Sequence, residues 1–165
     1  MSDTEYRRSG ARLSDDGRYR YVLWRTWDRS LPVLGFIMLN PSTADAEVND
    51  PTIRRCLSFG ARDGYGGIRV ANLFPYRATD PKRLLEVAHP PLIRPGHDPF
   101  DHVQDCETIV AGWGASVPRR LRWRAAEVAD GASRPLHCLG ITKDGSPRHP
   151  LMVKADQPLL PWEAA

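Results

Sequence analysis

Four short apolar runs, each ending abruptly in a polar or proline-containing segment, constrain the fold of this chain more than any other feature of its sequence. The runs cover residues 33–39, 68–74, 108–113 and 136–141. Apolar runs of this length that end at turn-forming residues are typical of strands buried on both faces of a sheet. We therefore expect these four segments to form the central strands of one sheet.

Helix signals separate the apolar runs and favour an α/β fold. Asp50-Pro51 and Asp80-Pro81 each place a capping residue before a proline at the first helical position. Strands that alternate with helices form a mostly parallel sheet with helices on both faces, so the expected fold is a three-layer α/β/α sandwich with a mostly parallel central sheet. Helices are predicted over 51–62, 81–88 and 118–129 and a helical turn over 99–106, and a further strand over 19–27 is expected to pair antiparallel at an edge.

The length and composition of the chain fit one domain. It has 165 residues, of which 41% are apolar and 26% charged, as is usual for a globular protein. We expect a single α/β domain over residues 1–165, with residues 1–18 as a loose N-terminal arm or a first short strand. The formal net charge of +3 permits a nucleic-acid partner but does not argue for one.

The three cysteines, Cys56, Cys106 and Cys138, form no Cys-x-x-Cys pair. We therefore expect no disulfide framework, no metal site and no cofactor. The first residues are polar and lack the pattern of a signal peptide, and no run of about 18 apolar residues occurs. These features predict a cytoplasmic protein that makes no contact with membranes, and they favour no particular oligomeric state.

Polar loops follow each of the four predicted central strands. The loops contain the sequences LNPSTAD, ANLFPYRATDP, WGAS and GITKDGSPRHP. In an open α/β sheet, ligands bind beyond the carboxyl ends of the strands, where such loops meet. The sequence therefore predicts one crevice that serves as an active site or a small-ligand site.

The loop after residue 39 contains the first candidate residue, Asn40. Its side-chain amide offers both a donor and an acceptor, which suits the orientation of a water or the reading of a base edge. The alternative is that Asn40-Pro41 only shapes a turn. We expect Asp50 to cap the following helix rather than to act as an acid. Arg54 and Arg55 lie in the first turns of that helix, where the dipole disfavours a cation, so a contact of one of them with phosphate is an alternative.

Residues in the second and third loops are further candidates. Asn72 interrupts a strand pattern, and we expect it to hold neighbouring loops by hydrogen bonds. Arg77 either pairs with Asp80 or contacts a substrate. Trp113 ends a strand and either stacks on a ligand ring or packs in the core. The run of arginines from Arg119 to Arg124 is expected to form a solvated helix face.

The last loop brings Lys143, Arg148 and His149 together within a few residues. A histidine donates to an oxyanion or transfers a proton near neutral pH. The alternative is a capped turn with surface cations, since Asp144-Gly145 is typical of a tight turn.

The runs MLNPSTADAEVNDPTIRRC, NLFPYRATDP, WG and LGITKDGSPRHPL resemble the bacterial family DUF1643. The resemblance covers roughly residues 19–154. It implies no established activity.

The order of the motifs is also similar to that of the uracil-DNA glycosylase superfamily. The matching segments are Asn40-Pro41-Ser42, then Asn72-Leu73-Phe74-Pro75, then Gly112-Trp113-Gly114, and finally His149-Pro150. Leu151 stands where that superfamily often has serine, and no aromatic residue follows Asn40-Pro41 closely. The resemblance implies the fold of that superfamily and a nucleic acid or nucleotide as the partner.

The expected function is that of a glycosylase-like hydrolase that cleaves the N-glycosidic bond of a modified nucleobase in DNA or a nucleotide. Cleavage in DNA requires extrusion of the target base and would place the protein in DNA repair. The alternatives are a non-catalytic nucleotide or nucleic-acid binding module and another small-molecule hydrolase. The resemblance implies that Asn40 positions a water or the base and that His149 stabilises the departing base, as the two catalytic residues. The expected substrate-binding residues are Pro41, Ser42, Thr43, Asp45, Asn72, Arg77, Trp113, Lys143 and Arg148, with Lys143 and Arg148 on phosphates.

Overall fold

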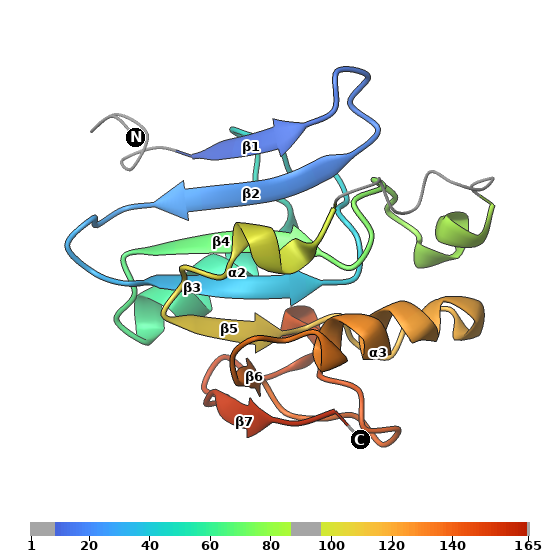
Figure 1. Ribbon diagram of the computed structural model, residues 1–165. Helices are drawn as coiled ribbons and strands as arrows, with labels where there is room; N and C mark the ends of the chain where they lie inside the picture. Colours follow the sequence, from blue (N-terminus) through green and yellow to red (C-terminus); the bar gives the residue numbers. More distant parts are fainter. Residues whose placement is uncertain (1–8, 87–96, 165) are drawn as a thin grey trace.

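A computed structural model describes residues 9–86 and 97–164 of the chain. Within these residues the protein forms one seven-stranded sheet in the order β1-β2-β4-β3-β5-β6-β7 (Figure 1). The strands are β1 Gly10–Leu13, β2 Arg20–Thr26, β3 Val33–Met38, β4 Gly67–Asn72, β5 Thr108–Ala111, β6 Leu136–Cys138 and β7 Leu160–Trp162.

The sheet is mixed, because parallel strands occupy its centre and antiparallel strands its edges. The pairs β4–β3, β3–β5 and β5–β6 are parallel, and β1–β2, β2–β4 and β6–β7 are antiparallel. The four predicted central strands are confirmed, and so is the antiparallel pairing of the strand over 19–27, which is β2. It is not the edge strand, because β1, the first short strand considered for residues 1–18, lies outside it. The prediction of a mostly parallel sheet is correct for the four central strands only. Strand β7 was not predicted, because Leu160-Pro161-Trp162 is too short and too exposed to form an apolar run.

In the described residues, two α-helices and four short 3₁₀-helices lie between the strands. The predicted helix over 51–62 is confirmed at the same bounds, since Asp50 caps it and Pro51 begins it. The predicted short helix over 81–88 is a 3₁₀-helix over 81–85, and residues 87–88 lie outside the described part of the chain. The predicted helical turn within 99–106 is confirmed as a 3₁₀-helix over 99–102. The helices are α2 Pro51–Arg62, η1 Pro81–Leu85, η2 Pro99–His102, η3 Arg119–Leu121, α3 Arg122–Asp130 and η4 Pro150–Met152.

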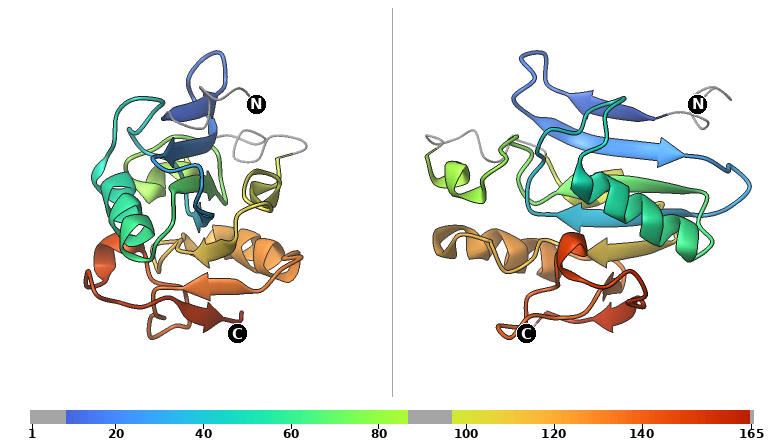
Figure 2. Two further views of the ribbon diagram at one scale, coloured as in Figure 1. Left: turned by 90° about the vertical axis from the view of Figure 1, so that its left-hand side faces the viewer. Right: turned by 180° about the vertical axis from the view of Figure 1, so that it is seen from behind.

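Helices cover both faces of the sheet, as Figure 2 shows in its left-hand view. Side chains of a strand alternate between the two faces, so each central strand supplies two cores. On one face, Phe36 packs in a cluster with Ile53 and Phe59 of α2. On the other face, Ile37 belongs to a cluster with Phe100 of η2 and Val128 of α3. Burial on both faces explains why these strands are continuous apolar runs.

The parallel strands place their carboxyl ends along one edge of the sheet, which runs across the strands and is distinct from the edge strands β1 and β7. In Figure 1, β3 and β5 point toward the same edge, where the loops after them begin. The loops after β4 and β6 begin at this edge as well, because β4 and β6 run parallel to β3 and β5. The segments that carry the candidate residues therefore meet there.

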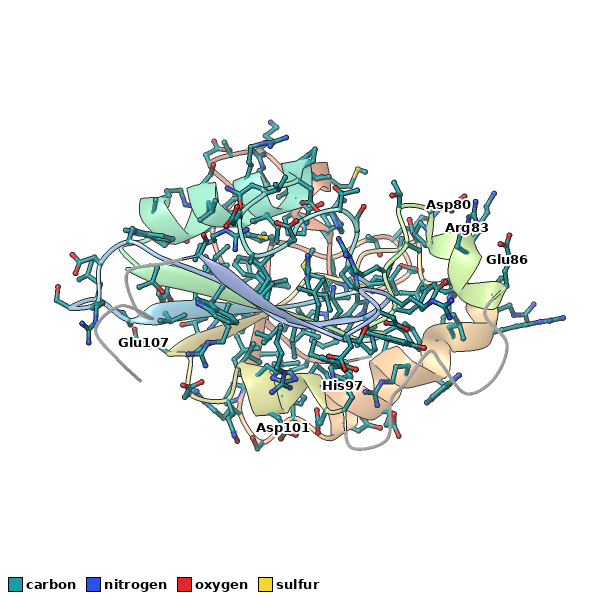
Figure 3. All side chains as sticks on the ribbon, turned by 90° about the horizontal axis from the view of Figure 1, so that it is seen from above. Asp80, Arg83, Glu86, His97, Asp101 and Glu107 are labelled. Atoms are coloured by element: carbon teal, nitrogen blue, oxygen red, sulfur yellow. The ribbon has the colours of Figure 1, made fainter. Side chains whose placement is uncertain are left out.

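His102 of η2 makes folding sensitive to acid. Its ring centroid lies 5.6 Å from that of His97, whose place in the fold is labelled in Figure 3. Burial, followed by the positive charge of Arg12, lowers the pKa of His102 from 6.5 to about 4. Between these two values the unfolded chain binds a proton that the folded chain does not. The stabilisation is therefore complete above pH 6.5 and is lost as the pH falls toward about 4.

We expect the melting temperature to fall as the pH is lowered from 7 to about 4, and His102→Asn to reduce the steepness of that fall. Circular dichroism melts of both proteins in a pH series measure the difference. The variant should retain part of the dependence, because burial also lowers the pKa values of His97 and His149. Parallel curves for the two proteins would show that His102 does not contribute to acid unfolding.

Candidate functional site

A cleft of about 830 Å³ lies at the edge where the carboxyl ends of the parallel strands meet. Its walls come from four loops, within residues 39–52, 78–81, 113–116 and 142–152. The volume falls in the range of sites that bind small molecules and cofactors, roughly 300–1,000 Å³. The predicted crevice therefore exists, and it is large enough for a ligand of nucleotide size.

Asn40 follows β3 directly and links two of these loops. Its Nδ2 donates to the carbonyl oxygen of Ala78 at 2.7 Å and to that of Pro41 at 3.1 Å. Two carbonyl acceptors fix which end of the amide is nitrogen, so Oδ1 is the group left to accept a hydrogen bond. Asn40 both shapes the turn and lines the cleft, which combines the two alternatives considered for it.

His149 is the N-cap of η4, and a hydrogen bond defines the tautomer of its ring. Nδ1 accepts the backbone N–H of Leu151 at 3.2 Å, so a neutral ring carries its proton on Nε2. Burial lowers the pKa of His149, against the opposing effect of Asp50. The ring is therefore neutral at pH 7, with Nε2–H available as a donor in the cleft that His149 lines.

Gly114 allows the last loop to approach the end of β5. Its φ of +75° lies in the left-handed region, which favours glycine, and a Cβ at this position would lie 3.1 Å from Cβ of His149. Its N–H donates to the carbonyl oxygen of Pro147 at 2.9 Å. The Trp113-Gly114 step thus brings His149 against the third loop.

Asp50 has the predicted role of helix cap and also reaches the cleft. Its Oδ1 accepts the N–H of Ile53 at 2.9 Å, and its Oδ2 accepts that of Ala44 at 3.4 Å. The residue is 8% exposed, and it lines the cleft beside Asn40 and His149. A negative charge therefore lies in the wall of the site.

A smaller cavity of about 40 Å³ lies at the inner end of the cleft. It shares Asn40, Asp50 and His149 with the cleft and adds Arg20 and Asn72. Its volume is sufficient for a water molecule, which needs about 10–15 Å³ measured in this way. The inner end of the site therefore combines these polar groups with the apolar side chains of Met38, Ile53 and Val70.

Arg20 of β2 is the functional candidate that the sequence did not reveal. It is 2% exposed, and it donates to the carbonyl oxygen of Ala44 at 3.0 Å and to Oδ1 of Asn72 at 3.4 Å. Its buried Nε has no acceptor within the described part of the protein. Burial lowers the pKa of Arg20 to about 10, so the guanidinium is still charged at pH 7. An arginine beside apolar residues in a predicted strand was the signal that could have identified it.

Arginines of β2 and of the loop after β4 hold the loop between β3 and α2 by donating to its backbone. Arg20 binds the carbonyl of Ala44, and Arg25 donates to the carbonyl oxygen of Asp45 at 2.7 Å. Arg77 donates to the carbonyl oxygen of Ser42 at 3.1 Å. The pairing of Arg77 with Asp80, one of the two alternatives considered for it, is not formed, because backbone carbonyls accept from its guanidinium. The loop that carries Asn40 is therefore preorganised.

The structure distributes the other predicted site residues between the site and its surroundings. Trp113 is 3% exposed and contacts the ring of Trp162 edge-on at 5.2 Å, so it packs in the core and presents only part of its surface to the cleft. Lining the cleft are Asn40, Ser42, Thr43, Trp113, Arg148 and His149, and lining the inner cavity are Pro41 and Asn72. Asp45, Arg77 and Lys143 are not among the lining residues.

Three further arginines donate to backbone carbonyl oxygens within the protein. Arg54 donates to the carbonyl oxygen of Asn49 at 2.6 Å, and Arg55 donates to the carbonyl oxygens of Pro150 and Val153. Arg124 is 7% exposed and donates to the carbonyl oxygen of Leu73 at 3.1 Å, so the expected solvated face is wrong for this residue.

In residues 9–86 and 97–164, no group of three or more His, Cys, Asp or Glu side chains comes together as a metal site would require. No helix in these ranges is long and apolar enough to span a membrane.

A family model described as "Protein of unknown function (DUF1643)" matches residues 20–151. This range contains every candidate residue of the cleft except Met152. No curated protein and no solved structure matches the chain. The comparisons therefore add no support for a relationship with the uracil-DNA glycosylase superfamily.

Proposed function

The chain belongs to the DUF1643 family, and because the description of that family specifies no reaction, we propose a function from the site itself. We propose that the protein is a hydrolase that cleaves the N-glycosidic bond between a nucleobase and its sugar, in a nucleotide or in nucleic acid. The products are the free base and a sugar with a hydroxyl group at the anomeric carbon.

The observation that carries this proposal is the change in polarity along the cleft. The inner end combines Arg20 and Asp50, which suits a neutral group that both donates and accepts hydrogen bonds. Apolar side chains of Leu39, Trp113 and Leu151 contribute to the walls. The exposed Arg148 is the cation of the lining near the solvent. The polar groups suit the edge of a base, the apolar walls suit its flat faces, and the cation suits a phosphate.

His149 supports the departure of the base. In a dissociative reaction the bond between the anomeric carbon and the base nitrogen breaks, and both electrons remain on the base. A neutral imidazole with its proton on Nε2 is a donor that stabilises this charge without a net charge of its own. The bond from Leu151 N–H to Nδ1 holds the ring in that tautomer.

Asn40 supports the attack of water. Its Nδ2 is fixed by two backbone carbonyls, so Oδ1 accepts a hydrogen bond from a water in the cleft. The water oxygen bonds to the anomeric carbon, and the proton that the water releases ends on the base nitrogen. Asp50 adds a negative charge to the same wall, which stabilises the positive charge that develops on the sugar.

The proposal includes a distant relationship to the uracil-DNA glycosylase superfamily and the three-layer form of its fold. The order of Asn40-Pro41, Asn72, Gly112 and His149-Pro150 along the chain supports it. Helices on both faces of the sheet are consistent with three layers. This support is analogy at the level of motif order and fold, so the reaction is argued from the cleft alone.

A second candidate is a nucleotide-binding module without catalysis. One observation favours it: the polar groups of the site are already engaged with the backbone. Asn40 donates to two carbonyls, both oxygens of Asp50 accept N–H groups, and Nδ1 of His149 accepts another. Groups fixed in this way recognise a ligand whether or not they transform it.

A base-release screen tests the proposal and separates the two candidates. The protein is incubated with oligodeoxynucleotides that carry modified bases, with RNA and with free nucleosides, and mass spectrometry measures the released base. Release that disappears in His149→Ala supports the hydrolase. Saturable binding without release from any substrate supports the binding module, and the absence of both contradicts a nucleotide ligand altogether.

A further inference from the structure

The positive charge of this protein is concentrated beside the cleft. Residues 112–124 and 139–152 contain six basic residues and one acidic residue, a net charge of +5, whereas the whole chain carries +3. The remainder of the chain therefore carries −2. An uneven distribution of this kind, more than net charge, indicates where an anionic partner binds.

Six exposed side chains of these two segments define what we call the cationic rim. They belong to the loop after β5 with the start of α3, and to the loop after β6. They are Arg119, Arg120, Arg122, Trp123, Lys143 and Arg148.

The cationic rim is a continuation of the cleft. Ala115, Ser116 and Thr142 line the cleft and lie within a few residues of the rim in sequence. Arg122 and Asp144 form an ion pair at 3.7 Å that joins the two segments of the rim. Figure 1 shows that the chain passes from β5 to α3 at the edge toward which β5 points. A long ligand that leaves the cleft on this side therefore crosses the rim.

Within the described residues, the side chains of Arg119, Arg120 and Lys143 form no hydrogen bond or ion pair, whereas Arg148 donates to the carbonyl oxygen of Ile141 at 3.0 Å. Arg124 is the member of the run that is buried, and its donors are used by Leu73 and His97. Arg119, Arg120 and Arg122 precede or begin α3, where the helix dipole disfavours a positive charge. In the part of the chain that the structure describes, the ion pair of the rim joins Arg122 to Asp144. Both side chains are exposed, so this pair contributes little to stability.

The other segments at this edge of the sheet do not share the charge of the rim. Helix η1 with its flanking residues carries Asp80 and Glu86 against Lys82 and Arg83, and Figure 3 shows Asp80, Arg83 and Glu86 together on that element. The loop before α2 carries Asp45 and Glu47. The mouth of the cleft is therefore positive on one side only, which defines a direction for a polyanion.

Trp123 distinguishes this surface from a simple basic patch. It is 52% exposed, and it stands between Arg122 and the rest of α3. Exposed aromatic rings among cations bind single-stranded nucleic acid, because unpaired bases stack on the ring while cations contact the phosphates. Paired bases in a duplex do not offer their faces in this way.

We propose that the cationic rim binds the sugar-phosphate backbone of a single-stranded polynucleotide. This inference rests on the proposed function. Arg119, Arg120 and Lys143 contact phosphates, and Trp123 stacks on a base next to the one in the cleft. The ligand of this site is accordingly a polymer, and a free nucleotide occupies only the cleft.

Fluorescence anisotropy of a labelled oligothymidylate of about 15 nucleotides measures this binding without any cleavage. The full-length protein is titrated over a series of salt concentrations. The double variant Arg119→Ala, Arg120→Ala is expected to reduce the slope of log affinity against log salt by roughly 1.4, since each phosphate contact to a single strand contributes about 0.7. Trp123→Ala is expected to weaken binding about fivefold or more at every salt concentration. Arg29→Ala, which removes one positive charge from the loop between β2 and β3 at the opposite edge, should change neither quantity.

Four outcomes overturn the inference. The first is that the protein does not bind the oligothymidylate, and the second is that the double variant leaves the salt slope unchanged. The third is that Arg29→Ala loses as much affinity as the rim variants do. The fourth is that the protein prefers anionic phospholipid vesicles or an acidic peptide to the oligothymidylate. Melting curves of the variants exclude unfolding as the cause of a loss. Binding through the rim without base release from any substrate would refute the proposed hydrolase and support the inference about the rim. Base release from nucleosides without oligonucleotide binding would refute the inference about the rim and support the proposed hydrolase.

Discussion

Replacing His149 by alanine is expected to lower the turnover number for base release by about 100-fold or more, because the variant loses one preorganised donor to the departing base. The KM should change little, since the donor acts mainly in the transition state. Single-turnover measurements on a substrate found in the base-release screen give both quantities. An equal loss of kcat and of affinity would assign His149 to binding instead.

A matched variant separates this role from the structural one. His149 also caps η4 through Nδ1, so alanine removes the cap as well as the donor. Asparagine is a good cap whose oxygen can accept the N–H of Leu151, but its shorter side chain cannot place its amide donor where Nε2–H lies. We expect His149→Asn to recover the melting temperature of the native protein and not its turnover. Recovery of both would show that the cap is the whole function of His149.

The pH profile gives a further measurement of the same residue. The pKa of His149 is lowered from 6.5, so the ring remains neutral at pH values where an exposed histidine is charged. Protonation of Nδ1 removes the acceptor for Leu151 N–H and turns a neutral donor into a cation. Turnover is therefore expected to fall as the pH falls through that lowered pKa, on the acid side of 6.5. A profile that is flat below pH 6.5 would exclude this ring from the reaction.

Local signals in the sequence were sufficient to predict the helices and strands whose formation depends on residues close together in the chain. Asp50 and Pro51 mark the start of α2, and Ile53, Cys56 and Phe59 recur at helical spacing, so that helix was predictable at both ends. The four central strands were predictable because both of their faces are buried. η2 ended earlier than predicted, since its capping signal starts a helix but does not extend it. β7 depends on pairing with β6, which no local pattern reports.

Predictions of the site failed where long-range hydrogen bonds decide the outcome. Arg77 has Asp80 three residues away, yet its guanidinium is used by backbone carbonyls of the loop before α2, which lies more than thirty residues away in the chain. The inner cavity requires Arg20 of β2 and Asn72 of β4 to lie side by side, and that depends on the order of the strands. Positions at the carboxyl ends of strands could be inferred, whereas the partners of each side chain could not.

The double role of Asn40 leads to the second large expected effect. Asn40→Ala removes both the acceptor for water and the bond to Ala78, and we expect turnover to fall by about 100-fold. Asn40→Asp keeps an acceptor oxygen but directs a carboxylate at the carbonyl oxygens of Pro41 and Ala78, so it should lower the melting temperature more than alanine does.

Thr79→Val is the control for the link between the two loops. The hydroxyl groups of Ser42 and Thr79 form a bond at 3.2 Å that joins the same loops as Asn40 and Ala78 do. Its loss should loosen the loops and yet lower turnover by less than about threefold, because an exposed neutral hydrogen bond contributes little. If Thr79→Val reduces turnover as strongly as Asn40→Ala, Asn40 acts only by joining the loops. If Asn40→Ala melts at the native temperature and has lost its turnover, the amide acts on the water itself, since a residue that only shaped the turn would change stability first.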